Sequence, residues 1–410
     1  MSESAAKALV MVVSRNEAVD TAVSTFQPEI LGIISSQNFL GPVARKCADL
    51  ESRMTVLYRL VDSPMEIHNA FERFEHLLAE LESLGYTADD TVLDVSGGTT
   101  PMRLGPALAA MQRGIRMVHQ RVVQSFIAGD WKVDPERPRE VVPMDNPLES
   151  TGLLREGQAM QLFDRRDYGA AALVFGDVLA KVTGAERRHY YRGLLLLSEG
   201  YAAWDVADYG AALKKLGSAR QELSAGFSEQ SLSGRASALA GRISAHLSFL
   251  GKVRGELSAE SVVDMLENAR RRILDQGRYD DGVARLYRAV EMFHQWRLKE
   301  HNSVSTKDVD WDEVSEDART KFLEATHLPE LPDHLDLTRA RALDRILNGD
   351  VAEDGNLFRN LLQQRNRSIL AHGLEPIGEK AALKFLEYVD GMVGETENRV
   401  AASHVSLEQE

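Results

Sequence analysis

The sequence predicts an α/β domain at the N-terminus and an all-helical remainder, a fold class of α/β plus all-α. Within the first 130 residues, short apolar runs alternate with helical patterns, as in a mostly parallel sheet that helices cover on both faces. Four prolines then stand among charged residues between positions 131 and 150, which indicates an extended linker. Beyond residue 150 the apolar residues recur at helical spacing. We therefore expect a sheet domain, a linker and a helical part.

Five strands are expected, each at a short apolar run. The runs span residues 7–13, 30–34, 54–61, 91–95 and 115–123. The clearest helical pattern between them spans residues 64–84. Ligands bind beyond the carboxyl ends of the strands in sheets of this kind, so the polar residues that follow the strands are candidate contacts. Those segments are residues 14–16, 35–38 and 94–102.

The segment after the fourth strand is the most informative of the three. Gly97-Gly98 lets backbone amides approach a ligand closely, and Thr99 or Thr100 can cap the next helix. Free amides at the start of that helix can bind an anion such as phosphate. A tight turn without a ligand explains the two glycines equally well. Neither G-x-G-x-x-G nor the G-K-[ST] of a P-loop is present, so a nucleoside-triphosphate hydrolase is not expected.

The pattern Asp94-x-Ser96-Gly97-Gly98-Thr99-x-x-Met102 resembles the CARF domain, the Rossmann-like sensor of CRISPR-associated proteins. The resemblance covers residues 1–130. It departs from the family at Thr100, where a lysine is common, and Arg15 or Arg103 could supply the cation instead. The resemblance implies a cyclic oligoadenylate held across a dimer axis. The implied ligand contacts are Ser14, Arg15, Gly97, Gly98, Thr99 and Thr100.

Residues 151–255 are expected to form a helical connector. The pentapeptide Asp-Tyr-Gly-Ala-Ala occurs at residue 167 and again at residue 208, and a looser copy follows at Arg278-Tyr279. Small residues and tyrosines would let paired helices pack closely. The two copies lie further apart than the roughly 34 residues of a tetratricopeptide repeat, so we describe them only as repeat-like. We expect a connector here and no binding site.

Residues 261–297 form a strongly amphipathic pattern with several arginines. The arginines are Arg270, Arg271, Arg272, Arg285 and Arg288. Such a run is more often a solvated face than an RNA contact, and the sequence leaves both interpretations open.

Near the C-terminus, apolar residues at helical spacing from Leu357 to Leu370 predict a helix that Gly373 terminates. Seven steps of about 100° would place Arg365 and His372 within roughly 20° on one face. Ile369 lies on the same stripe, so we expect the stripe to pack. The helix macrodipole alone would explain two cations at a helix end.

Arg365-Asn366 followed by His372 resembles the signature of the HEPN ribonucleases, in which an arginine and a usually polar residue precede a histidine. The implied domain spans residues 256–402, and residues 403–410 form a frayed tail. Arginine forks onto phosphate oxygens and histidine titrates near neutrality. We assign Arg365 to the scissile phosphate, Asn366 to positioning and His372 to proton transfer or charge stabilisation, with Ser368 as a weaker candidate. HEPN relatives combine two copies of the motif, and this chain has one, which predicts a homodimer.

Composition excludes several other functions. The net charge of −14 argues against a broad basic face for duplex nucleic acid, so RNA would need a local basic cleft. One cysteine, Cys47, excludes an internal disulfide and fits a cytoplasmic protein. No apolar run is long enough for a membrane span, and no secretory signal is visible. The sequence lacks H-E-x-x-H and G-x-S-x-G, so we expect no metal site, no serine hydrolase site and no cofactor.

The two resemblances together imply a metal-independent endoribonuclease of type III CRISPR defence that cuts single-stranded RNA when cyclic oligoadenylate binds. The alternative is a nucleotide-sensing adaptor whose HEPN-like domain is catalytically silent. A second activity that degrades the cyclic activator is a weaker possibility.

Overall fold

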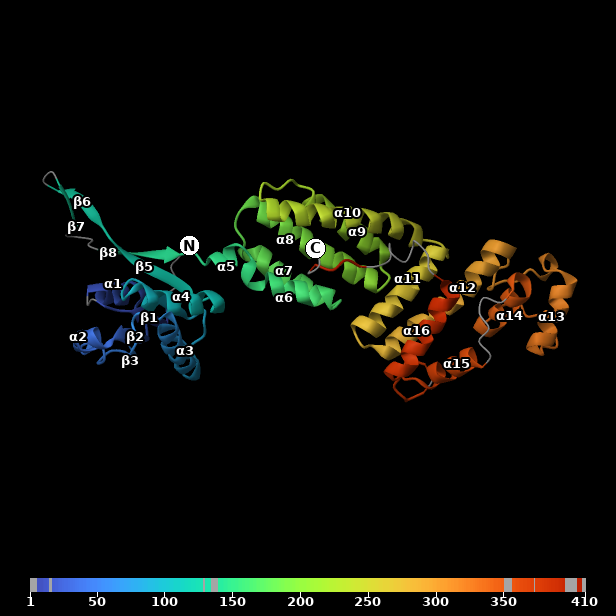
Figure 1. Cartoon of the computed structure of the whole chain (residues 1–410), viewed down its shortest axis with the longest axis horizontal. Coiled ribbons are helices and arrows are strands. Elements are labelled where there is room, and N and C mark those ends of the chain that lie inside the picture. The colour runs from blue at the N-terminus through green and yellow to red at the C-terminus, as the bar shows by residue number, and fades with distance from the viewer. Residues whose placement is uncertain are drawn as a thin grey trace. The chain divides into compact units, whose positions relative to one another are not determined.

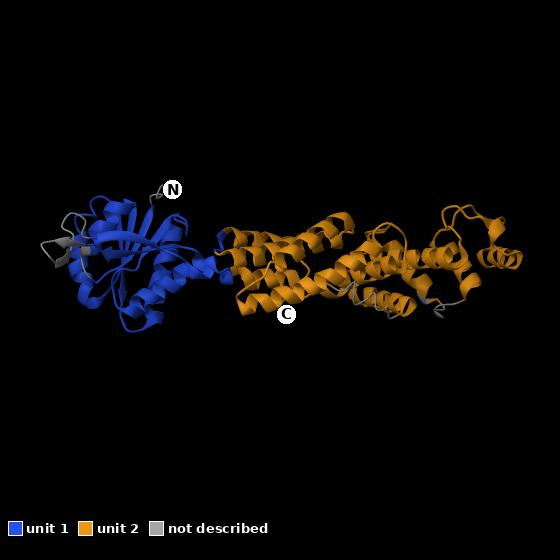
Figure 2. Ribbon diagram, turned by 90° about the horizontal axis from the view of Figure 1, so that it is seen from above, with its two compact units in different colours: residues 1–154, 181–183 blue, residues 155–180, 184–410 orange. Residues whose placement is uncertain are grey.

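The computed structural model describes residues 6–14, 17–127, 130–133, 139–349, 356–371, 373–394 and 404–407. The chain divides into two compact units (Figure 2). The first comprises residues 1–154 and 181–183, and the second comprises residues 155–180 and 184–410. Each unit is described by itself.

The first unit contains a six-stranded sheet with the strand order β3-β2-β1-β4-β5-β8 (Figure 1). The strands are β1 (Ala8–Val12), β2 (Ile30–Ser36), β3 (Thr55–Val61), β4 (Thr91–Asp94), β5 (Arg116–Val122) and β8 (Arg139–Met144). The first five are parallel, and β8 is antiparallel to β5. The five strands expected from the apolar runs are confirmed.

Helices cover both faces of this sheet because successive side chains of a strand point to opposite faces. On β1, Ala8, Val10 and Val12 pack with α3 (Ile67–Ser83) and α4 (Thr100–Arg113). Leu9 and Met11 pack with α1 (Glu17–Phe26) and α2 (Gln37–Cys47) on the other face. Buried strands therefore read as continuous apolar runs, which is why the sequence located them.

The prediction of an extended linker at residues 131–150 is wrong. Residues in that range form β7 (Asp130–Val133), which pairs with β6 (Gln124–Ile127), then β8 and the short helix α5 (Pro147–Ser150). The sheet thus extends past residue 130, where the first domain was expected to end. Pro143 lies opposite Val118 on β8, which is the last strand in the order of this sheet. A strand at an edge tolerates proline, which lacks a donor for the ladder.

The second unit is helical, as expected, and the predicted fold class of α/β plus all-α is confirmed. Its first helices are α6 (Leu153–Asp164), α7 (Tyr168–Lys181), α8 (Ala185–Asp205), α9 (Tyr209–Leu223) and α10 (Gln230–Val253). The repeated pentapeptide marks helix starts, because the carboxylate of Asp208 accepts a hydrogen bond from the Ala211 amide at 3.0 Å. Gly200 of α8 lets α9 approach closely, since a Cβ there would lie 2.7 Å from Leu216 Cδ2.

A second group of helices follows in the same unit. The elements are α11 (Ala259–Arg270), the π-helical turn η1 (Arg271–Asp275), α12 (Tyr279–Asn302), the 3₁₀ turn η2 (Trp311–Glu313), α13 (Glu316–Thr326), α14 (Leu337–Asn348), α15 (Leu357–Arg367) and α16 (Glu379–Val393). Side chains of α11, α12, α15 and α16 share one apolar core. This core supports α15, which carries Arg365.

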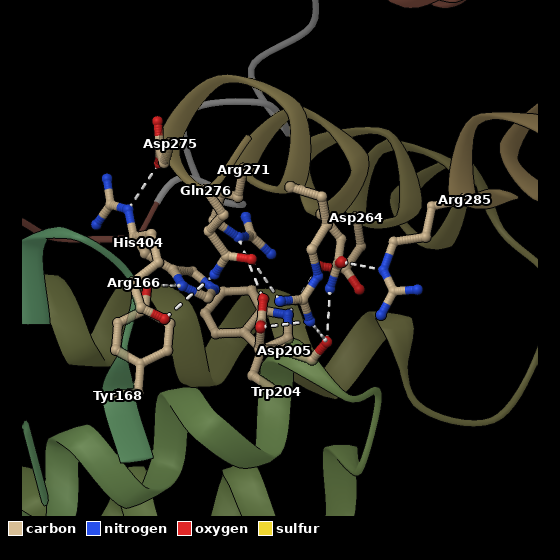
Figure 3. A network of polar contacts seen from close by, with 12 residues as sticks. Arg166, Tyr168, Trp204, Asp205, Asp264, Arg271, Asp275, Gln276, Arg285 and His404 are labelled. Carbon is tan, nitrogen blue, oxygen red and sulfur yellow. Dashed lines mark hydrogen bonds and ion pairs between the residues drawn. The ribbon is translucent and has the colours of Figure 1, made fainter. Parts of the chain in front are cut away.

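Four of the arginines expected on a solvated or RNA-binding face form ion pairs with the body of the unit, and Figure 3 labels two of them, Arg271 and Arg285. Arg288 does lie on a solvated face, where it pairs with Glu291 of the same helix. Arg271 and Arg272 are each only 5% exposed, and Arg272 Nη2 lies 2.6 Å from the carboxylate of Asp205 in α8. Arg270 pairs with Asp390 of α16 at 2.6 Å. The local pattern could not reveal these partners, because they come from helices far away in the sequence.

The prediction of a frayed tail is also wrong for the tail residues that the structure describes. Residues 404–407 lie against α6, α7 and α8, and His404 is 6% exposed. His404 Nδ1 lies 2.6 Å from the Tyr168 hydroxyl, and its ring stacks on Tyr201 with centroids 4.4 Å apart. The Leu407 amide donates to Asp164 at 2.7 Å. Burial of aromatic and apolar surface therefore anchors this segment.

The burial of His404 in this segment predicts that the stability of the fold depends on pH. Burial holds the pKa of His404 well below its usual range, and Arg271, His246 and Arg166 lower it further. Below pH of about 6.5 the unfolded chain binds a proton at this residue that the folded chain does not bind, so stability falls as the pH falls. We expect the free energy of unfolding to drop by up to about 1.4 kcal/mol per pH unit from this group.

Urea unfolding between pH 7.5 and 5.5 measures this slope. His404→Phe should flatten it, leaving the contribution of His294, whose pKa burial also lowers. An unchanged slope in His404→Phe would show that the residue is not buried in neutral form.

Candidate ligand-binding and catalytic sites

A buried polar cluster holds the loop that follows β4. Asp94 is fully buried, and its Oδ1 accepts hydrogen bonds from the Ser96 amide at 2.8 Å and from the Ser96 hydroxyl. Gln120 Nε2 donates to Asp94 Oδ2 at 2.6 Å and to the Ala18 carbonyl at 2.8 Å. Burial raises the pKa of Asp94, and the hydrogen bonds from Ser96 and Gln120 oppose that shift. Sequence reasoning missed this positioning role, although an aspartate ending a strand was a usable signal.

The structure brings Ser14, Gly97 and Gly98 together at the carboxyl ends of β1 and β4. The Gly98 amide donates to Ser14 Oγ at 3.0 Å, and the Gly97 amide donates to the Val12 carbonyl at 3.1 Å. A Cβ on Gly97 would lie 2.5 Å from that carbonyl oxygen, and Gly98 has a φ of +83°. Both positions therefore require glycine.

The helix start beyond the glycines is arranged as expected for a cap. Thr99 is the N-cap of α4, and its Oγ1 accepts from the Met102 amide at 3.4 Å while its hydroxyl donates to the Pro64 carbonyl. Thr100 is exposed, and Arg103 Nη2 lies 3.4 Å from its Oγ1. Arg15, the other predicted cation, lies outside the described residues.

A cavity of about 420 Å³ opens beside this loop. Its lining includes Ser96, Thr100, Arg103, His119 and Gln120. Three of these residues were not assigned from the sequence. A cationic side chain and a helix N-terminus at one cavity suit a phosphate-bearing ligand.

The helix that carries the second motif ends earlier than expected. α15 stops at Arg367, and Ser368 has extended backbone with φ −76° and ψ 158°. The prediction that Arg365 and His372 share one helical face is therefore wrong, and His372 lies outside the described residues. Ile369 and Leu370, expected to pack in the same stripe, are 61% and 55% exposed.

Backbone contacts explain the early end. The Gly373 amide donates to the Ser368 carbonyl at 3.1 Å, and the Glu375 amide donates to the Arg367 carbonyl at 3.2 Å. The chain thus folds back on the last turn of α15 and satisfies carbonyls that the helix leaves open. Any side chain at position 373 would collide with the backbone of Arg367. Glycine marks the stop, as predicted, but through a fold-back and not at the helix end.

Arg365 is held by two neighbours. Its guanidinium carbon lies 4.2 Å from the centroid of the Tyr287 ring of α12, a cation–π distance. Its Nη1 donates to Asn366 Oδ1 at 3.0 Å. Arg365 remains partly exposed, so its other N–H groups can reach a ligand. Tyr287 was not found from the sequence, because nothing local links it to a residue so distant in the chain.

Tyr287 should affect the RNA cleavage that the HEPN-like motif implies, because its ring holds Arg365 in position. Tyr287→Leu removes the ring face, and at about 1 kcal/mol for the cation–π contact the cleavage rate should fall about fivefold. Tyr287→Phe keeps the ring and serves as the matched control, with a rate close to that of the unmodified protein. Equal cleavage rates in Tyr287→Leu and Tyr287→Phe would show that the ring does not contribute to the site.

Neither a metal centre nor a membrane helix was found in the parts of the chain that the structure describes. No group of three or more His, Cys, Asp or Glu side chains there is arranged to hold a metal ion. None of the helices described above is both long enough and apolar enough to cross a membrane.

Comparison with known proteins gives matches to both halves of the second unit. The family model of the Csm6 6H domain matches residues 152–239, and that of the Csm6 HEPN domain matches residues 253–394. No curated protein matches the sequence.

Among solved structures, Enterococcus italicus Csm6 bound to cyclic hexa-2'-fluoro-hexa-dAMP matches with a TM-score of 0.55 at 13% identity, over 95% of this chain and 94% of that chain. This likeness shows a common fold. Can2 from Sulfobacillus thermosulfidooxidans in complex with cyclic tetra-adenylate matches with a TM-score of 0.24 at 14% identity, over 52% of this chain and 68% of that chain, and carries no weight. Because the two Csm6 domain models together match more than half of its residues, the chain belongs to the Csm6 family of CARF–HEPN ancillary ribonucleases.

Proposed function

We propose that this protein is a homodimeric, metal-independent endoribonuclease that cuts single-stranded RNA when cyclic oligoadenylate binds its first unit. The observation that carries the proposal is the placement of Arg365, partly exposed over Tyr287 and hydrogen-bonded to Asn366, in a domain that matches the Csm6 HEPN model. The partly exposed guanidinium can bind the scissile phosphate.

The cleavage chemistry needs a cation at the phosphate and a group that handles protons. The RNA 2′-oxygen forms a bond to phosphorus while the bond to the 5′-oxygen breaks. One proton leaves the 2′-hydroxyl and one reaches the departing 5′-oxygen. Arg365 stabilises the charge that develops on the phosphate oxygens, Asn366 orients Arg365, and His372 handles a proton. No metal ion is required for these steps.

The dimer follows from one motif per chain and from exposed apolar side chains beside it. Ile369, Leu370 and Leu374 are 61%, 55% and 90% exposed, all in the segment that follows Arg365. Apolar side chains clustered on a surface mark an interaction site, and a second copy of this domain would cover them. The two motifs would then form one composite site.

The activator site is the loop cluster of the first unit. Ser14, Gly97, Gly98, Thr99 and Thr100 would contact the ring phosphates, with Arg103 and Arg15 as cations. The fold shared with a Csm6 bound to a cyclic hexa-dAMP analogue supports this assignment.

Gly97→Ala tests the activator site. A methyl group would push the loop away from the Val12 carbonyl, so binding of cyclic oligoadenylate should weaken about tenfold or more. Gly41→Ala is the matched control, because a Cβ there would meet only Arg45 Nη1, at 3.8 Å. Calorimetric titration measures both. Equal affinity in the two variants would place the ligand elsewhere.

Labelled single-stranded RNA in EDTA tests the ribonuclease assignment. Cleavage to 2′,3′-cyclic phosphate ends that disappears in both Arg365→Ala and His372→Ala supports it. Intact RNA with every cyclic oligoadenylate would favour the silent adaptor. Loss of the intact ring in Arg365→Ala protein would assign activator degradation to another site.

A further inference from the structure

A polar cavity lies in the second unit, away from both motifs in the sequence. It has a volume of about 600 Å³ and opens between the turn that joins α6 to α7 and the π-helical turn η1. Its charged lining comprises Arg165, Arg166, Asp167, Asp205, Arg272, Asp275 and Arg278. Arginines outnumber aspartates here, in a chain whose net charge is −14.

The aspartates of this lining are already engaged. Asp275 pairs with Arg166 Nε at 2.8 Å, and Asp205 pairs with Arg272 Nη2 at 2.6 Å (Figure 3). Asp167 accepts a hydrogen bond from the Ala170 amide at 3.2 Å, at the start of α7. The two ion pairs cancel, which leaves Arg165, Arg278 and Asp167 with an excess of one positive charge in the lining.

Two of the arginines are fixed in place by these contacts. Arg166 Nη1 also donates to the Val405 carbonyl at 3.0 Å, and Arg272 Nη1 donates to Gln276 Oε1 at 2.6 Å. Arg272 is only 5% exposed. The wall of the cavity is therefore built from fixed, ion-paired side chains.

The other two arginines of the lining have no partner among the described residues. Arg165 and Arg278 are exposed at the rim, and across the described residues neither side chain forms an ion pair or a hydrogen bond. They contrast with Arg270 and Arg285, which carboxylates neutralise. Unpaired guanidinium groups at a cavity mouth suit phosphate oxygens, which they bind with forked hydrogen bonds.

We propose that this junction cavity binds a phosphate-bearing ligand, with Arg165 and Arg278 as its direct contacts beside a wall that the ion pairs of Arg166 and Arg272 hold in place. The volume suits a ligand of nucleotide size. The phosphate could belong to a free nucleotide or to the RNA backbone. The proposal does not rest on the proposed function, because it concerns binding and requires no cleavage.

The test uses full-length protein and a labelled 2′-O-methyl RNA 12-mer, which cannot be cut through its 2′-oxygen. The double variant Arg165→Gln/Arg278→Gln should bind the 12-mer about tenfold more weakly. The slope of log affinity against log salt should fall by about 1.4, the value for two lost contacts to a single strand. Arg188→Gln/Arg254→Gln is the matched control, since both residues are exposed and lie outside the lining. Its affinity and slope should barely change.

Two further arms identify the source of the phosphate. In the first arm, adenosine 5′-monophosphate competes with the 12-mer. Displacement of the 12-mer from the unmodified protein, without displacement from Arg165→Gln/Arg278→Gln, indicates that the cavity binds a free nucleotide. Binding of the 12-mer that the mononucleotide leaves unchanged indicates an RNA backbone. Equal affinity loss in the two double variants, or 12-mer binding that neither changes, overturns the proposal. Both substituted pairs are exposed, and thermal melting confirms that each variant is folded.

Discussion

Arg365→Ala is expected to reduce RNA cleavage by about a hundredfold to a thousandfold, the usual cost of removing a group that stabilises transition-state charge. The guanidinium is held over Tyr287 and beside Asn366, and it makes no ion pair within the described residues. Its removal should therefore leave the fold intact and affect chiefly the chemical step.

The matched control is Arg359→Ala, an exposed arginine on the same helix. Arg365→Lys adds a second comparison, because lysine keeps the charge but loses the forked donors. Single-turnover cleavage with saturating activator measures all three. Comparable rates for Arg365→Ala and Arg359→Ala would place the cleavage site elsewhere.

Asp205→Ala is expected to destabilise the second unit by about 3 kcal/mol or more, since it removes a buried carboxylate from beside two buried arginines. Asp205 lies 2.6 Å from Arg272 Nη2 and 3.7 Å from Arg271 Nε (Figure 3). Asp281, 3.1 Å from Arg272 Nε, would remain as a counter-charge of Arg272. The substitution should therefore weaken mainly the contact between α8 and the π-helical turn.

Asp177→Ala provides the comparison, because Asp177 forms an exposed ion pair with Arg155 at 2.8 Å. Exposed pairs contribute about 1 kcal/mol at most. Urea unfolding of both variants gives the two free energies. A loss in Asp205→Ala no larger than in Asp177→Ala would mean that water already screens this cluster.

The sequence was sufficient where one segment determines its own structure. The runs that became β1 and β2 are buried on both faces, so their apolar character is continuous. Gly97 stands where backbone meets backbone and Gly98 has a φ of +83°, so only glycine fits at either position. The α/β and all-α parts could be predicted for these reasons.

Sequence reasoning failed where partners come from distant parts of the chain. Arg272 is neutralised by Asp205, and Arg365 lies on Tyr287, which no local pattern reveals. The end of α15 depends on the fold-back through Gly373, and the docking of His404 depends on Tyr168 and Tyr201. Pro143 was read as a linker residue because the pattern does not show that β8 is an edge strand.

The central claim is that a ligand in the first unit controls cleavage in the second. Such control requires the ligand to prefer one of two states of the dimer. The direct measurement is the RNA cleavage rate of the unmodified protein with and without each cyclic oligoadenylate, beside Gly97→Ala. We predict that one ring size raises the rate strongly and that Gly97→Ala needs more of it to reach the same rate. A rate that no cyclic oligoadenylate changes would contradict the account.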